Sequence, residues 1–250
     1  MQWLTNKLAT YTIATVLVLL CCVSPASAND KDTSSSLTIA CSANFVAVMD
    51  QLLPVFKAQV KTDIQVKVVT GSSGTLATQL RYGAPYDVFF SADAILPTQL
   101  KTDGFGIEST VYALGELVFY SSEGYDSLEG VMTRLPHITL AIANPRYAPY
   151  GQAAVEVLAH LQTKPKKTVT GGSILHAFQY VESQNAELGL IAKSLLQQPH
   201  NGTAIAIPSE WYQPIEQHVL LVKDSVFARQ FYHFVQTEQA QQLIKSMGYR

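Results

Sequence analysis

The chain is short of cysteine and of charged residues, and each shortage excludes a class of protein. Three cysteines occur among 250 residues, and two of them, Cys21 and Cys22, fall within a stretch that has the features of a leader. Cys41 is therefore left without a partner, which excludes a fold held together by internal disulfides. Charged residues make up 14% of the chain, and its formal net charge is −2. A surface for nucleic acid or for anionic membranes is therefore not expected.

The first 28 residues have the features of a cleavable signal peptide. Lys7 provides a basic start, residues 8–20 form an apolar run, and Ala-Ser-Ala at 26–28 has the small-x-small form of a signal peptidase site. We therefore expect cleavage after Ala28 and export to the periplasm. We also expect the mature chain, which begins at residue 29, to be a monomer.

Two other interpretations of this leader are less favoured. A membrane anchor needs ~20 consecutive apolar residues, and the run at residues 8–20 is shorter. A lipid anchor on Cys21 or Cys22 usually follows a small residue, whereas the bulky Leu20 stands before Cys21. We therefore treat residues 29–250 as a soluble exported chain.

Strand-like and helix-like patterns alternate along the mature chain. Short apolar runs predict strands at residues 37–41, 64–69, 87–91, 137–143, 167–170, 188–192 and 203–207. Apolar residues at helical spacing predict helices at residues 45–56, after 74, and at 152–161, 174–181, 226–235 and 238–247. Repeated βα units of this kind predict an α/β fold with doubly wound, mostly parallel sheets.

Two long extended segments, residues 111–121 and 218–223, interrupt this alternation. We interpret them as crossings between two lobes. Lobe I is then residues 29–115 together with 219–250, and lobe II is residues 116–218. Two crossings make a hinge, and a hinge between two lobes makes a cleft.

Polar residues and glycines follow four of the predicted strands. They lie at residues 42–44, 71–74, 144–151 and 171–174. A serine or asparagine at one such junction is ordinarily a helix cap. Four junctions of the same chemistry on two lobes indicate an anion site instead, because helix N-termini present free N–H groups and a positive dipole end. Glycine at these places would let the main chain lie against a ligand.

The junctions also lack the residues that other sites need. They contain no lysine and no cluster of histidine or cysteine at metal-ligand spacing, and Arg146 is the nearby guanidinium. We therefore expect no metal centre and no cofactor. Neutral donors suit an oxyanion without a proton, whereas phosphate keeps a proton at neutral pH and needs an acceptor. Asp93 is a candidate acceptor, although capping of the next helix is its more ordinary role.

The junctions belong to longer segments that resemble a known family. These segments are SANF at 42–45, GSSGTLATQ at 71–79, GAPYDVFFSAD at 83–93, ANPRYAPYGQAA at 143–154, ELGLIA at 187–192 and KSMGY at 245–249. Together they resemble the periplasmic molybdate-binding proteins of ABC importers over nearly all of the mature chain. The resemblance implies a type II periplasmic binding fold, capture of molybdate or tungstate by lobe closure, and delivery to a membrane permease.

The resemblance also implies the residues that bind the oxyanion. Ser73 is expected to donate from its hydroxyl and its backbone, and Asn44 from the start of the first helix. Tyr150 and Ile174 are expected to donate from lobe II. Some relatives have a hydroxyl residue where this chain has Ala43, so either Ser42 supplies that donor or one donor is lost.

Two alternatives remain open for the function. The same fold could bind another tetrahedral oxyanion, either sulfate or phosphate. An exported serine hydrolase that uses Ser73 is an alternative of a different class. That reaction needs a base within hydrogen-bond reach of Ser73, and the sequence has neither a candidate base near the junctions nor the G-x-S-x-G spacing. We therefore expect a binding protein and not an enzyme.

Overall fold

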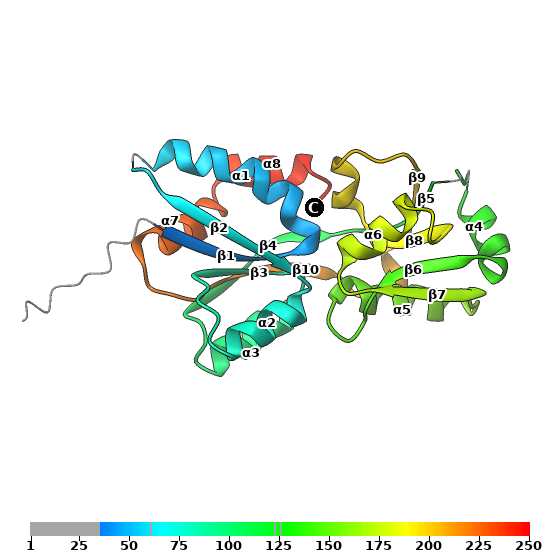
Figure 1. Ribbon diagram of the computed structural model, residues 1–250, viewed down its shortest axis with the longest axis horizontal. Coiled ribbons are helices and arrows are strands. Elements are labelled where there is room, and N and C mark those ends of the chain that lie inside the picture. The colour runs from blue at the N-terminus through cyan, green and yellow to red at the C-terminus, as the bar shows by residue number, and fades with distance from the viewer. Residues whose placement is uncertain (1–35, 61, 123, 126) are drawn as a thin grey trace, which may run out of the picture. The chain divides into compact units, whose positions relative to one another are not determined.

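Two α/β lobes make up the described part of the chain, which in this computed structural model is residues 36–60, 62–122, 124–125 and 127–250 (Figure 1). The predicted leader, residues 1–28 with its cleavage site, lies outside the described residues. Within the described residues, no helix has the length and apolar character that a membrane crossing requires.

Lobe I is built on a five-stranded sheet in the order β2-β1-β3-β10-β4. Its strands are β1 Ser36–Ser42, β2 Gln65–Gly71, β3 Val88–Ser91, β4 Glu108–Gly115 and β10 Ile215–Leu221. β1 runs parallel to both β2 and β3, while β10 runs antiparallel to β3 and β4. The predicted parallel sheet is therefore present, with one antiparallel strand that arrives from far along the chain.

Helices cover both faces of this sheet. They are α1 Val46–Gln59, α2 Ser73–Arg81, α3 Ile95–Thr102, α7 Val226–Phe234 and α8 Glu238–Ser246, and a short 3-10 helix, η1 Ala43–Phe45, precedes α1. Successive strand residues point to opposite faces, so Val88 and Phe90 pack in the core under α1, α7 and α8. Phe89, between them, packs in the separate core under α2 and α3. Because both faces of the sheet are covered at β3, this strand is a continuous apolar run from Val88 to Phe90.

Lobe II has a second sheet in the order β7-β6-β8-β5-β9. Its strands are β5 Leu117–Ser121, β6 Thr139–Ala143, β7 Lys167–Gly171, β8 Leu188–Ala192 and β9 Thr203–Ala206. β6 runs parallel to β7 and β8, whereas β5 runs antiparallel to β8 and β9. The helices are α4 Leu128–Arg134, α5 Pro149–Leu161 and α6 Ile174–Glu182, with 3-10 helices η2 Leu135–His137, η3 Lys193–Gln197 and η4 Ser209–Trp211.

The two predicted extended segments contribute to the sheets in different ways. Residues 111–121 divide at Glu116, because β4 belongs to the first sheet and β5 to the second. Residues 218–221 are the later part of β10 and residues 222–223 follow it, so the proposed lobe boundary between 218 and 219 falls inside that strand. The helices α3 and α4 were not predicted, since each is short and has few apolar residues at helical spacing.

Candidate functional site

A small cavity lies where the carboxyl ends of the parallel strands of both lobes meet. Its volume is about 10 Å³, and its lining consists of Ser42, Ala43, Asn44, Ser72, Ser73, Ala92, Ala148, Pro149, Tyr150 and Ile174. The structure thus brings all six predicted site residues together, four from lobe I and two from lobe II. Each of the six is at most 3% exposed. A ligand can therefore reach them only when the lobes separate. Their role in binding an oxyanion stays a prediction.

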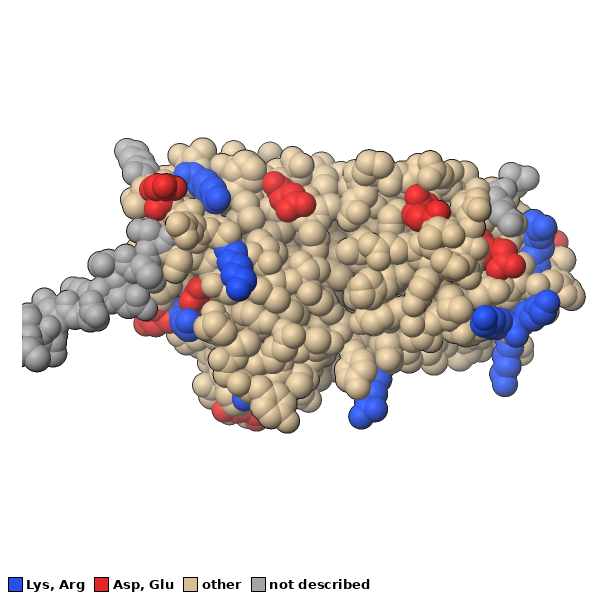
Figure 2. Space-filling model, viewed as in Figure 1, with Lys and Arg blue, Asp and Glu red and all other residues tan. Residues whose placement is uncertain are grey.

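The described residues that line this cavity carry no charge. Tyr150 is the titratable residue among them, and burial raises its pKa well above the usual value, so it stays neutral around neutral pH. The face of the molecule that Figure 2 shows does not concentrate charge at this place either. In Figure 2, charged side chains are scattered over both lobes, and no large patch of one sign lies over the junction between them. Attraction of an anion must therefore come from hydrogen-bond donors and helix N-termini.

The two serines between Gly71 and Gly74 have different tasks. Ser72 is the N-cap of α2, and its Oγ accepts a hydrogen bond from the Thr75 N–H at 3.4 Å. The Ser73 Oγ instead accepts from the Ala92 N–H at 2.9 Å. This contact occupies an acceptor site of the hydroxyl and leaves its O–H to donate. Ser73 is therefore held as a donor at the wall of the cavity.

Asn44 uses its side chain within the protein. Its Nδ2 donates to Gln217 Oε1 at 2.7 Å and to the Tyr249 hydroxyl at 2.8 Å. Its backbone carbonyl accepts from Ser194 Oγ at 2.8 Å and from the Tyr249 hydroxyl at 2.9 Å. Both N–H groups of the amide are thereby engaged. The donor that Asn44 can offer to a ligand is its backbone N–H, in the first turn of η1.

The lobe II residues lie at two helix N-termini. Pro149 is the first residue of α5 and has no N–H, so Tyr150 is the first residue of that helix with a backbone donor. Ile174 is the first residue of α6, and Ser173 caps that helix by accepting from the His176 N–H at 3.3 Å. The Tyr150 hydroxyl hydrogen-bonds Tyr249. The part of Tyr150 and Ile174 available to an anion is therefore the backbone.

Ser42 provides a further hydroxyl at the cavity. Neither Ser42 nor the neighbouring Tyr112 has a side-chain partner at hydrogen-bonding geometry in the part of the chain that the structure describes. Burial raises the pKa of Tyr112, and the nearby Ser42 hydroxyl partly opposes this shift. A buried hydroxyl without a partner is costly. This favours the alternative in which Ser42 supplies the side-chain donor over the alternative in which that donor is lost, and the choice stays a prediction.

Asp93 lies one residue before the N-cap of α3 and accepts a hydrogen bond from the first turn of that helix, which is the kind of role predicted for it. Its Oδ1 accepts from the Leu96 N–H at 2.6 Å, and its Oδ2 accepts from the Ser91 hydroxyl at 3.3 Å. Burial is the largest effect on its carboxyl and raises its pKa. Asp93 is not part of the cavity lining. Among the residues that the structure describes, the cavity lining therefore has no carboxylate to accept a ligand proton.

The glycines of the 71–74 junction differ from expectation. Neither Gly71 nor Gly74 lines the cavity, so they do not bring the main chain against a ligand there. A Cβ at Gly71 would meet Leu76 at 3.4 Å, an ordinary contact, whereas a Cβ at Gly74 would lie 2.9 Å from the Tyr147 carbonyl oxygen. Gly74 thus lies close to the main chain of the opposite lobe.

Sequence reasoning missed three buried residues that support the site. Tyr249 belongs to the segment KSMGY but received no role, and Gln217 and Ser194 gave no signal. All three contact Asn44, from positions 150 to 205 residues away in the sequence. The sequence separation explains the omission, because no local pattern links them.

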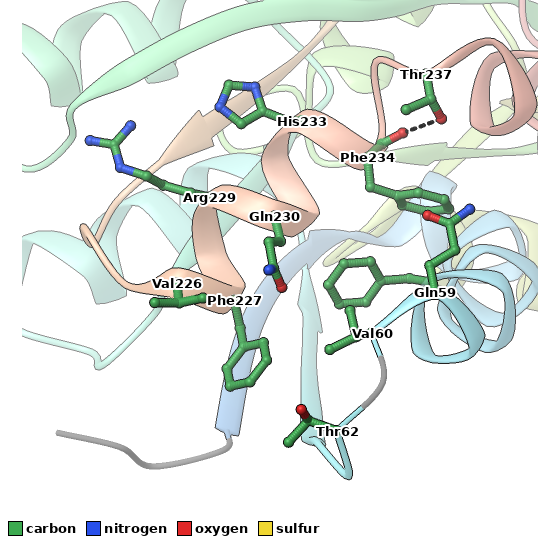
Figure 3. Close-up of a pocket in the computed structure, with 11 residues that line it drawn as sticks. Gln59, Val60, Thr62, Val226, Phe227, Arg229, Gln230, His233, Phe234 and Thr237 are labelled. Atoms are coloured by element: carbon green, nitrogen blue, oxygen red, sulfur yellow. Dashed lines mark hydrogen bonds between the residues drawn. The ribbon is translucent and has the colours of Figure 1, made fainter.

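A larger pocket of about 650 Å³ lies elsewhere, between the end of α1 and α7 (Figure 3). Its lining includes Phe227, Val60 and Phe234, and also Arg229 and His233, whose side chains leave α7 on a different side from Phe227 in this view. Arg229 forms ion pairs with Asp224 and Glu108. An apolar pocket whose guanidinium is already paired is a poor site for an anion, so the small cavity is the candidate site.

Comparison with known proteins agrees with this architecture. The family model of the bacterial extracellular solute-binding proteins matches residues 37–250. The molybdate-binding protein ModA of Rhodobacter capsulatus is 34% identical over 221 residues, which cover 84% of this chain and 86% of the relative. ModA of Azotobacter vinelandii is also 34% identical, over 86% of this chain and 90% of the relative.

The solved structure of the periplasmic molybdate-binding protein of Azotobacter vinelandii superposes with a TM-score of 0.78. It is 31% identical in sequence, and the match covers 86% of this chain and 98% of that chain. The predicted two-lobed type II periplasmic binding fold is therefore confirmed. The chain belongs to the bacterial extracellular solute-binding protein family.

Proposed function

We propose that this protein captures molybdate or tungstate outside the inner membrane for an ABC importer. The observation that carries the proposal is the buried, uncharged cavity between the lobes, whose available groups are hydrogen-bond donors. Molybdate and tungstate are dianions with four acceptor oxygens and no proton at neutral pH. A lining made of donors can satisfy every oxygen of such an ion without a countercharge.

The donors come from both lobes, which couples binding to closure. Lobe I offers the Ser73 hydroxyl and N–H groups at the start of η1 and α2, and lobe II offers the N-termini of α5 and α6. An ion held by one lobe alone leaves half of its oxygens to water. Both sets of donors converge only when the lobes meet, so the ion favours the closed form. A permease can then recognise the loaded protein by its shape.

The setting of this function is part of the proposal. Cleavage after Ala28 would release residues 29–250 into the periplasm as a monomer. The partner is the membrane permease of an ABC importer, and the ion is cargo, so no cofactor takes part. We propose residues 29–115 with 219–250 as lobe I and residues 116–218 as lobe II, with the return to lobe I lying within β10, whose residues 215–218 pair with β4 of the lobe I sheet.

A receptor for sulfate or phosphate is the second candidate, because those ions share the tetrahedral shape. The serine hydrolase is less well supported. The contact of the Ser73 Oγ is a backbone N–H, and no histidine or carboxylate belongs to the described cavity lining. An activated serine needs such a base.

Calorimetric titration of the exported protein tests the proposal directly. Protein purified from a bacterial periplasm and dialysed free of oxyanions is titrated with molybdate and then with tungstate. We expect one ion per protein and submicromolar dissociation constants for both. Absence of binding by both ions would contradict the proposal, and tight binding of sulfate or phosphate alone would favour the second candidate.

Tyr249→Phe should weaken both the fold and the site. The change removes a hydroxyl that donates to the Asn44 carbonyl and accepts from its Nδ2, leaving a buried N–H unpaired. We expect the free energy of unfolding to fall by about 1–3 kcal/mol and molybdate affinity to fall with it, because Asn44 is less firmly held. Urea denaturation and calorimetry measure the two effects.

Tyr86→Phe is the matched control for this change. The Tyr86 hydroxyl donates to Gln79 in lobe I, away from the cavity. Its loss should leave molybdate affinity unchanged. If Tyr249→Phe binds molybdate as well as wild type does, Tyr249 has no part in positioning Asn44.

A further inference from the structure

Gly74 makes a main-chain contact between the two lobes. It is the second residue of α2 in lobe I, and its N–H donates to the Tyr147 carbonyl in lobe II at 2.8 Å. Tyr147 lies in the loop between β6 and α5. The bond can form only when the lobes are together, because it joins one lobe to the other beside the cavity.

The space at Gly74 admits no side chain. A Cβ built there would lie 2.9 Å from the Tyr147 oxygen and 3.0 Å from the Tyr147 Cα, both of them backbone atoms. The backbone of Gly74 is helical and has no positive φ, so α2 itself does not need glycine. Alanine is the better helix former. The need for glycine at this position therefore comes from the opposite lobe.

The loop that faces Gly74 is held firmly by its own hydrogen bonds. The Asn144 carbonyl accepts from the Tyr147 N–H at 3.1 Å and from the Ala148 N–H at 2.9 Å, and the Asn144 N–H donates to Gly171 at 2.8 Å. The Asn144 side chain accepts from the Arg146 N–H at 3.0 Å. A loop tied in this way cannot move aside cheaply for a methyl group.

We propose that Gly74 determines how tightly the closed lobes hold the ion, although it lines no part of the cavity. The inference rests on the proposed function, because the property that Gly74 affects is the closure of the lobes around the bound ion. Gly74 lets α2 approach the 144–148 loop until its N–H bonds Tyr147. On the other side of the site, Ser194 of lobe II donates to the Asn44 carbonyl of lobe I. Contacts between the two lobes thus complete the closure. At the Gly74 contact, no residue larger than glycine fits.

Gly74→Ala tests this inference, with Gly130→Ala as the matched control. Gly130 also lies within a helix, α4, and a Cβ there would meet Ser127 Oγ at an ordinary 3.5 Å. Affinity and dissociation rate are measured for molybdate, tungstate and sulfate, together with the melting temperature without ligand. We expect Gly74→Ala to bind at least roughly 10-fold more weakly, mainly through faster dissociation. We expect its melting temperature not to fall, and Gly130→Ala to bind like wild type.

The outcomes separate this inference from the proposed function. If wild type binds none of the ions, the proposed function fails. If wild type binds and Gly74→Ala binds equally well with the same dissociation rate, the inference is overturned. Should Gly74→Ala not fold, amide exchange of wild-type Gly74 by NMR decides. Added molybdate should slow that exchange, and an unchanged exchange rate would reject the interlobe bond.

Discussion

Phosphate is expected not to bind measurably to this protein at neutral pH. It keeps a proton there, and that O–H needs an acceptor. The described residues of the cavity lining include no carboxylate, and Asp93 is already occupied as the cap of α3. The phosphate O–H would face donors instead, and an unpaired buried polar group costs about 1–3 kcal/mol.

Sulfate is expected to bind at least ~100-fold more weakly than molybdate, a difference of about 2.7 kcal/mol. It has the same charge and no proton, so only its smaller size can distinguish it. The S–O bonds of sulfate are shorter than the Mo–O bonds of molybdate. The lobes would therefore have to close further for all donors to reach the sulfate oxygens. The contacts between the lobes, from the Gly74 N–H to the Tyr147 carbonyl and from the Ser194 hydroxyl to the Asn44 carbonyl, prevent this, because packed groups do not compress. Some donors then remain out of reach of the sulfate oxygens.

Calorimetry with all four oxyanions, in one buffer free of phosphate and sulfate, measures this selectivity. Tungstate serves as the positive control, because its size and charge nearly equal those of molybdate. Titration of molybdate into protein that already contains the weaker ion extends the measurement to higher dissociation constants. Sulfate or phosphate affinity equal to that for molybdate would contradict the model of a rigid, donor-lined cavity.

Ser73→Ala is expected to weaken molybdate binding by roughly 1.5–3 kcal/mol, the range for a hydrogen bond to a charged partner. This corresponds to roughly a 10- to 150-fold rise in the dissociation constant. The change removes the O–H donor and also leaves the Ala92 N–H without its acceptor. Ser73 is 1% exposed, so water replaces the lost contact poorly. The measurement is calorimetric titration of both proteins.

Ser225→Ala provides the control for Ser73→Ala. Ser225 caps α7 by accepting from the Ala228 N–H at 3.3 Å, outside the cavity. Loss of a cap costs about 0.5–2 kcal/mol of stability, yet affinity should not change. Wild-type affinity in Ser73→Ala would remove Ser73 from the proposed site.

The sequence by itself determined most of the strands and helices, though not α3 and α4, and the chemistry at their junctions. The short apolar runs of β1 and β3 and the helical spacing in α1 are local patterns, because each reports which faces of one element are buried. The junction residues could be predicted for the same reason. A helix that begins directly after a strand needs capping groups or offers free donors, and these lie close together in the sequence. All six predicted site residues consequently line one cavity.

Tertiary structure decided which member of each junction does what. Ser72 and Ser73 are neighbours of the same type. The resemblance singled out Ser73, but the physical difference between the two serines is the Ala92 N–H, which the end of β3 brings beside Ser73. Tyr147 in the other lobe determines that position 74 needs glycine. Tyr249, near the end of the chain, holds the Asn44 side chain in place. A local pattern cannot report such contacts, because they arise only when separate elements pack against one another and two lobes meet.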